Sequence, residues 1–212
     1  QGYDKLLEGF KKFLDRGWFD PTDPTQTWHP INDAILYLQT DPTMLGGPSL
    51  QGLAALIGVP PEKIVLPSMH YGLGGLTDQE LNVLYNGADI LLRPSKGEGF
   101  GLPVLEMMAT RGLVAGTDFS SLPELLKGRG FLLENRESTI EICCYPGVDI
   151  AHDNFGHYRA TVSLEDIAKT LKFAYDAYKG NQARIKAIEK YKEAAYQFAL
   201  YHTWDKCVDK WA

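Results

Sequence analysis

The chain contains the stretch RPSKGEGFGLPVLEMMA at residues 93–109, and this stretch decides its fold. The apolar run ILL at residues 90–92 predicts a buried strand that leads into it. Glycines follow at positions 97, 99 and 101. Pro103 then stands where a first helical turn tolerates a residue without an N–H. The stretch therefore predicts a strand, a glycine-rich turn and a helix, in that order.

Such a turn suits an anion. The start of a helix has backbone N–H groups without acceptors and a partial positive charge, which favours a phosphate. Glycines let a ligand approach the backbone closely. Glu98 lies in the turn and Glu106 lies one turn inside the helix, with seven residues between them. A carboxylate only accepts hydrogen bonds, so it suits hydroxyl groups and not a phosphate. We therefore predict a site for a nucleoside-diphosphate sugar.

The string EGFGLPVLE at residues 98–106 resembles the E-x7-E motif of retaining glycosyltransferases of the GT-B fold, group 1 or family 4 type. Residues 81–95 (LNVLYNGADILLRPS) are similar to the helix and strand before that motif. Residues 112–124 (GLVAGTDFSSLPE) are similar to the strand, loop and helix start after it. The specific resemblance covers about residues 77–134. It implies the C-terminal, donor-binding domain, which is one half of a GT-B fold.

The resemblance also implies roles for individual residues. The enzyme would transfer a hexosyl unit from a nucleoside-diphosphate sugar with retention of configuration. Glu98 would be catalytic, binding hydroxyls of the donor sugar and stabilising the developing positive charge, and Glu106 would hold the ribose. The other donor-binding residues implied are Gly99, Phe100, Gly101, Leu102, Ser95, Lys96, Pro67 and Ser68.

The leaving diphosphate must be stabilised as its bond to the sugar breaks. Amides at the helix start, from residues 99–102, can do this, and Lys96 is a nearby cation. The Asp-x-Asp pattern of metal-dependent glycosyltransferases is absent. We therefore expect donor binding without a metal or cofactor. His152, Asp153 and His157 fit no metal-binding signature, and a solvated loop is the simpler interpretation of them.

Short apolar runs alternate with helical segments along the chain. This pattern predicts an α/β fold with a Rossmann-like parallel sheet and helices on both faces, followed by a C-terminal helical extension. Ligands of such sheets bind beyond the carboxyl ends of the strands, where the glycine turn lies. Residues 134–162 are less regular, and no helix or strand is assigned to them. Further expected elements are a helix from the first residues to Gly17, a loop at 20–30, strands at 34–38 and 64–66, and helices capped by Thr77 and Ser163.

We expect residues 1–180 to form the donor-binding domain without its first strand. Residues 181–212 would form C-terminal helices that pack toward an absent N-terminal domain. The aromatic and apolar stripe of these helices would then be partly exposed; it comprises Phe198, Tyr201, Trp204, Val208 and Trp211. The chain begins at a helix without a Met, which favours a piece of a longer protein. The missing domain would belong to that protein or to a partner chain.

Composition excludes several classes of function. A net charge of -6 over 212 residues argues against nonspecific nucleic-acid binding. Three cysteines form neither a zinc signature nor a disulfide framework, and no apolar run is long enough to span a membrane. A cytoplasmic location is expected, with a peripheral membrane role left open because lipid-linked acceptors occur in the resembled family. The acceptor, whether glycan, lipid or protein, stays unknown.

Two alternatives remain. The chain could be a nucleotide-sugar binding module that is not itself a catalyst. It could also be a dinucleotide-dependent oxidoreductase, because Gly97-x-Gly99 follows a strand and Asp118 follows the next strand, where a ribose-binding acid belongs. Leu102 at the position of the third glycine disfavours the oxidoreductase.

Overall fold

The computed structural model describes residues 2–19, 25, 27–40, 49–67, 76–142, 156–203 and 205–206; for residues 136–142 and 156–158 it describes the backbone only. The elements are α1 (Tyr3–Arg16), β1 (Trp18–Phe19), β2 (Trp28–His29), β3 (Leu36–Tyr37), α2 (Leu50–Ile57), the 3-10 turn η1 (Pro61–Lys63), β4 (Ile64–Val65), α3 (Asp78–Gly87), β5 (Ile90–Arg93), α4 (Leu102–Ala109), β6 (Leu113–Thr117), α5 (Leu122–Leu126), β7 (Phe131–Leu133), β8 (Asn135–Ile142), β9 (Gly156–Val162), α6 (Leu164–Tyr178) and α7 (Gln182–Tyr201).

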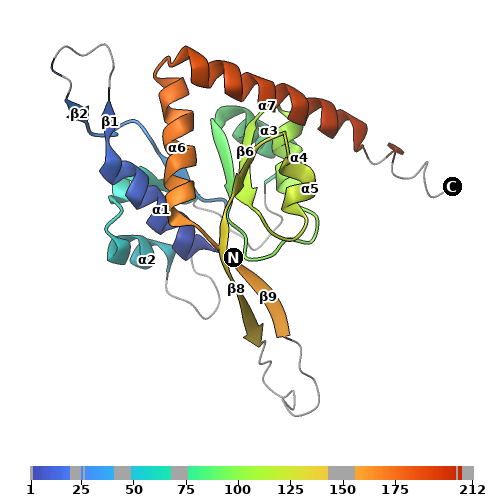
Figure 1. Cartoon of the computed structure of the whole chain (residues 1–212), viewed down its shortest axis with the longest axis horizontal. Helices are drawn as coiled ribbons and strands as arrows, with labels where there is room; N and C mark the ends of the chain where they lie inside the picture. Colours follow the sequence, from blue (N-terminus) through green and yellow to red (C-terminus); the bar gives the residue numbers. More distant parts are fainter. Residues whose placement is uncertain are drawn as a thin grey trace.

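The strands around the glycine turn form a parallel sheet in the order β5-β6-β7. Ile90 of β5 pairs with Leu113 of β6, and Ala115 of β6 pairs with Phe131 of β7. β3 and β4 also pair in parallel. Because helices connect these parallel strands, the predicted α/β fold is confirmed (Figure 1).

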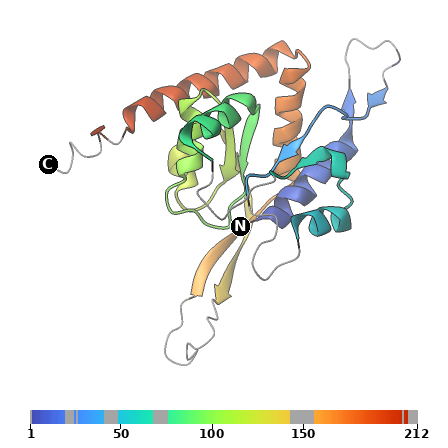
Figure 2. The ribbon, with the colours of Figure 1, turned by 180° about the vertical axis from the view of Figure 1, so that it is seen from behind.

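Helices cover both faces of the three-stranded sheet, as predicted. Successive residues of a strand point to opposite faces. Ala115 of β6 lies in a core made with α1 and α6, whereas its neighbour Val114 lies in a second core made with α4, α5 and α7. Both side chains are 0% exposed. The two helical layers are seen on either side of the sheet in Figures 1 and 2.

The predicted helix boundaries are confirmed where the sequence carries a cap. Gly17 ends α1. Thr77 and Glu80 form a capping box at the start of α3, each side chain accepting from the other residue's amide. The Ser163 side chain accepts from the Asp166 amide and starts α6. At the starts of α3 and α6 a side chain accepts from a backbone amide that has no partner inside the helix. At the end of α1 a glycine adopts the positive φ that terminates a helix.

One loop prediction was wrong, and a segment without assigned elements contains a hairpin. Residues 134–162 contain an antiparallel hairpin, in which Ile140 of β8 pairs with Tyr158 of β9, and it extends away from the helices and the sheet (Figures 1 and 2). Within the predicted loop at 20–30, Trp28 pairs with Phe19 in a second small ladder. Neither segment has the regular apolar alternation from which a strand is predicted, because backbone pairing alone requires no such pattern.

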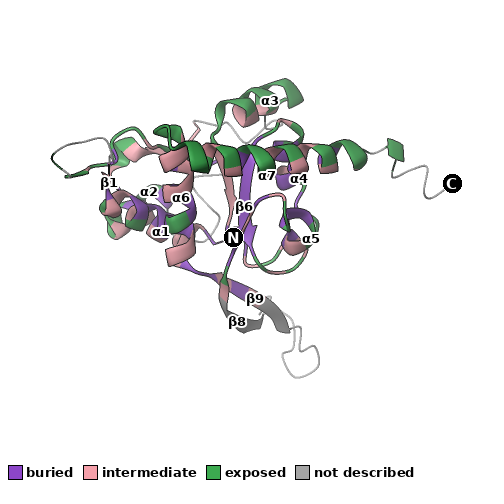
Figure 3. Cartoon of the chain, turned by 45° about the horizontal axis from the view of Figure 1, so that its top comes forward, coloured by how far each residue is buried: buried purple, intermediate pink, exposed green. Residues whose placement is uncertain are grey.

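The long helix α7 crosses the layer that contains α4. Ala195 and Ala199 are buried there, and Phe198 is half-buried against the same core. Tyr201 is 58% exposed, and much of the outer side of α7 faces solvent (Figure 3). Of the predicted stripe, Trp204, Val208 and Trp211 lie outside the described residues. The division at residue 180 and the packing toward another domain stay predictions.

Candidate functional site

The glycine turn connects the carboxyl end of β5 to the start of α4. Gly101 precedes α4 with a φ of 96°, in the left-handed region that glycine adopts at no steric cost. A Cβ at this position would lie 3.0 Å from Cδ1 of Leu125. Position 101 therefore requires glycine for both its backbone and its surroundings. At Gly99, by contrast, an added Cβ would have no atom of the described residues within 4 Å, which leaves room beside the backbone for a ligand.

The first turn of α4 has fewer free backbone N–H groups than a helix start usually leaves. The amides of Val104 and Leu105 donate to the carbonyl oxygen of Gly101, at 2.9 and 3.3 Å. Pro103 has no N–H. The Leu102 amide is therefore the first-turn donor that has no acceptor inside the helix. This amide lies at the start of α4, next to the turn where the anion is predicted to bind.

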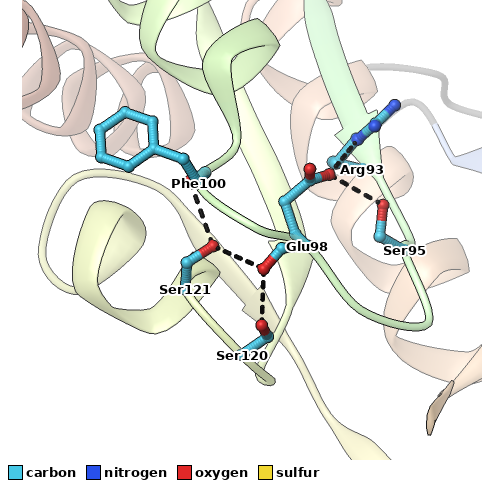
Figure 4. A network of polar contacts seen from close by, with 6 residues as sticks. All are labelled: Arg93, Ser95, Glu98, Phe100, Ser120 and Ser121. Carbon is cyan, nitrogen blue, oxygen red and sulfur yellow. Dashed lines mark hydrogen bonds and ion pairs between the residues drawn. The ribbon is translucent and has the colours of Figure 1, made fainter. Parts of the chain in front are cut away.

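Two side chains of the same segment hold the carboxylate of Glu98. Its Oε2 atom accepts from Nε of Arg93 at 2.9 Å and from Oγ of Ser95 at 3.3 Å (Figure 4). Its side chain is 17% exposed, and that of Arg93 is 35% exposed. The carboxylate is thus partly withdrawn from water and paired with a cation, which fixes its orientation.

Glu106 has a different environment. It lies on the exposed side of α4, and its Oε2 accepts from the hydroxyl of Tyr85 on α3 at 2.7 Å. Burial, and then the hydrogen bond to Glu106, raise the pKa of Tyr85 above its ordinary value. The phenol therefore stays protonated at neutral pH and acts as the donor of this bond.

The loop between β6 and α5 contacts the turn through two serines. Oγ of Ser120 donates to the carbonyl oxygen of Glu98 at 2.6 Å (Figure 4). Oγ of Ser121 lies 3.1 Å from the carbonyl oxygen of Phe100 and 3.2 Å from that of Glu98. The turn is therefore held by its neighbour on the sheet edge as well as by its own strand and helix.

The base of the hairpin also reaches the turn. The Ala160 amide of β9 donates to the carbonyl oxygen of Lys96 at 2.9 Å. Nη1 of Arg159 lies 3.6 Å from where a Cβ of Gly97 would stand. β9 therefore contacts the first part of the turn, in a segment to which the sequence analysis assigned no strand.

The start of α1 adjoins the same edge of the sheet. A Cβ at Gly2 would lie 2.1 Å from the carbonyl oxygen of Pro94, which no side chain could accept. Gly2 has a φ of 80° and precedes the first residue of α1. The amino-terminal ends of α1 and α4 are thus both brought to the residues that follow β5.

The predicted site residues fall into two groups. Those between Ser95 and Glu106 come together at the carboxyl edge of the sheet, with Phe100 and Leu102 exposed. Pro67 is half-buried two residues beyond β4, and Ser68 lies outside the described residues. Sequence reasoning gave no role to the following partners: Tyr85, Arg93, Ser120, Ser121 and Arg159. A cation at the end of an apolar strand was the one signal available, at Arg93.

The described residues of this site include no cluster of side chains suited to a metal ion. Within the part of the chain that the structure describes, no group of three or more His, Cys, Asp or Glu residues could hold a metal ion. Of the residues considered for a metal, His152 and Asp153 lie outside the described residues, and only the backbone of His157 is described. Among the described helices, none has the length and apolarity needed to cross a bilayer.

Residues 47–143 match the family model of the group 1 glycosyl transferases. A stretch of 73 residues is 40% identical to the serotype-specific mannosyltransferase WbdA of Escherichia coli. That match covers 31% of this chain and 9% of WbdA. The chain therefore corresponds to a small part of this relative's length.

Solved structures share the fold. A glycosyltransferase from Rickettsia africae ESF-5 superimposes with a TM-score of 0.56 at 18% identity, over 94% of this chain and 39% of that one. The C-terminal domain of a group 1 family glycosyl transferase, LpcC, from Francisella tularensis gives a TM-score of 0.52 at 18% identity, over 94% and 77% of the two chains. The chain is thus structurally similar to GT-B glycosyltransferases.

Proposed function

We propose that this chain is the donor-binding part of a glycosyltransferase that transfers a hexosyl unit from a nucleoside-diphosphate sugar. One observation carries the proposal. A glycine turn with an acid at either side, Glu98 and Glu106, lies at the carboxyl edge of a parallel sheet, within the residues that match the group 1 glycosyl transferases. Ligands of open parallel sheets bind at this edge.

The diphosphate would lie against the turn, where the Leu102 amide and the open backbone at Gly99 can approach it. Lys96 would add a positive charge. These groups would stabilise the negative charge that grows on the diphosphate as the glycosidic bond breaks.

The two acids would bind the two hydroxyl-bearing ends of the donor. Arg93 and Ser95 both contact Oε2 of Glu98, which leaves Oε1 to accept from hydroxyls of the sugar. As positive charge develops on the sugar, the same carboxylate would stabilise it, with retention of configuration at the transferred carbon. Glu106 would accept from the ribose hydroxyls. Ser95 and Pro67, with the unplaced Ser68, complete the proposed donor contacts.

A screen of nucleoside diphosphates tests the proposal. We expect at least one of UDP, GDP, ADP and dTDP to raise the melting temperature of the chain, because a ligand that binds only the folded state stabilises it. We expect NAD to have no such effect and EDTA to leave the shift unchanged. Stabilisation by NAD alone would favour the dinucleotide-dependent oxidoreductase. Loss of the shift in EDTA would contradict metal-independent binding.

A binding module without catalytic activity is the second candidate. The chain spans 39% of the R. africae glycosyltransferase, so residues beyond this chain can be needed for transfer. We expect the acceptor, whether glycan, lipid or protein, to be bound by a further domain or a partner chain, in the cytoplasm or at a membrane surface. Measuring nucleotide-sugar turnover by this chain, with and without such a domain, distinguishes the two candidates. Turnover by the chain alone would exclude the second.

A further inference from the structure

The loop at residues 118–121 contacts the glycine turn through the hydroxyl groups of two serines. Ser120 and Ser121 both direct Oγ to the carbonyl oxygen of Glu98, at 2.6 and 3.2 Å. Ser121 also contacts the carbonyl oxygen of Phe100 at 3.1 Å (Figure 4). Two successive serines thus bind two alternate carbonyls of the turn.

Neither serine adopts the arrangement that its own loop would favour. Ser120 has a φ of 60°, a left-handed conformation in which glycine is the least strained residue. Ser121 occupies the position before α5 where a serine commonly caps the helix, yet its side chain caps no amide of α5. Ser120 therefore has an unfavourable backbone conformation, and Ser121 leaves its helix without a side-chain cap. In both residues the hydroxyl binds the turn.

The contacts determine which way the amides of the turn point. No cis peptide bond occurs among the described residues, and in a trans peptide the C=O and the next N–H point in opposite directions. With the carbonyls of Glu98 and Phe100 directed at the serines, the N–H groups of Gly99 and Gly101 point away from them. Gly99 is also the position where the backbone is open.

From this geometry we infer that Ser120 and Ser121 are positioning residues of the donor site. By binding the carbonyls of Glu98 and Phe100, they keep the amides of Gly99 and Gly101 directed at the diphosphate. The inference rests on the proposed function, because it assigns the loop to the same site. Neither serine touches the ligand.

The test is calorimetric binding of UDP, GDP, ADP and dTDP to the full 212-residue chain. Those that bind are then measured with its variants. We expect Ser120→Gly and Ser121→Ala each to weaken binding about threefold to tenfold, the loss typical of one hydrogen bond. Ser120→Gly should not lower the melting temperature, because glycine relieves the left-handed backbone. Ser121→Thr keeps a hydroxyl and should bind within about twofold of the unchanged chain.

Ser49→Ala is the matched control. It removes a serine hydroxyl that caps α2 and should lower the melting temperature while leaving the affinity unchanged. Equal affinities of the unchanged chain, Ser120→Gly and Ser121→Ala would overturn the positioning role and leave the proposed function intact. Failure of Ser121→Thr to retain binding would also overturn it. If the unchanged chain binds none of UDP, GDP, ADP and dTDP, both proposals fail together.

Discussion

Glu98 and Glu106 belong to one short motif, but the structure supports them differently. The carboxylate of Glu98 is 17% exposed and is held by a guanidinium and a hydroxyl, both close to it in sequence. The carboxylate of Glu106 is exposed on a helix and is held by one phenol from another helix, Tyr85. The spacing of the two acids in the sequence thus gives no indication that their environments differ.

The difference suggests a division of labour. A carboxylate with fixed partners is oriented before a ligand arrives, which is what stabilising a developing charge requires. A carboxylate with a single neutral partner can exchange that partner for a hydroxyl of the ligand at little cost. We therefore expect Glu98 to matter most for turnover and Glu106 to matter most for affinity.

The largest expected effect is that of Glu98→Gln on turnover. The amide keeps the size of the side chain but loses its negative charge, so release of nucleoside diphosphate from the nucleotide sugar should fall about 100-fold to 1,000-fold. Binding of the nucleoside diphosphate, which lacks the transferred hexosyl unit, should change less than about threefold. Equal losses of turnover and of nucleoside diphosphate affinity would remove the distinction between the two acids.

Glu106→Ala should act on affinity. Loss of a charge-assisted hydrogen bond costs about 1.5–3 kcal/mol, so the nucleoside diphosphate should bind about 10-fold to 100-fold more weakly in calorimetry. Glu189→Ala, which removes an acid of α7 paired with Lys192, is the control and should bind normally. An unchanged affinity in Glu106→Ala would refute the ribose assignment.

Arg93→Met tests how firmly Glu98 is held. The variant leaves a partly buried carboxylate with one hydroxyl partner, and we expect the free energy of unfolding in urea to fall by about 1–2 kcal/mol. Lys192→Met breaks an ion pair with the more exposed Glu189 and should cost less than about 1 kcal/mol. Similar losses of unfolding free energy in the two variants would mean that the ion pair of Glu98 stabilises the fold no more than an exposed ion pair does.

Tyr85→Phe should have the smallest effect, about a twofold to fivefold loss of nucleoside diphosphate affinity, because one neutral donor is removed. The stability of this variant should differ from that of the unchanged chain at high pH. Burial and Glu106 raise the pKa of Tyr85, so the folded chain holds the phenol proton more tightly than the unfolded chain does.

The contribution of Tyr85 to stability is therefore intact below about pH 10, the ordinary pKa of tyrosine, and is lost as the pH rises further. Urea unfolding at a series of alkaline pH values should show a steeper loss in the unchanged chain than in Tyr85→Phe. Parallel losses would show that Tyr85 titrates like an exposed tyrosine.

The sequence predicted features that depend on neighbouring residues. Gly101 and Pro103 indicate a turn and a helix start, and Thr77 indicates a capped helix. Each of these residues determines the conformation of its immediate neighbours in the sequence. The α/β fold follows from the order of such elements. The hairpin was missed because β8 and β9 pair through their backbones across a long separation, with no apolar alternation to mark them.

The partners of the acids were missed for a similar reason. Tyr85 and Glu106 lie on different helices, and nothing in either segment records that α3 and α4 pack together. Ser120 and Ser121 looked like ordinary loop residues until the parallel sheet brought their loop beside the turn. The fold predicts that loops at neighbouring strand ends contact each other, but it does not predict which residues make the contact.

The close approach of Gly2 to Pro94 has an evolutionary consequence. Since even one methyl group at position 2 would collide with the Pro94 carbonyl, helix α1 can lie here only if the residue before it is glycine. Homologues that retain this glycine should keep α1 seated on the strand exit, and homologues that have replaced it should have moved the helix outward. Position 2, which is distant in sequence from Glu98 and Glu106, would thus indicate in each homologue whether α1 encloses the strand exit beside the glycine turn.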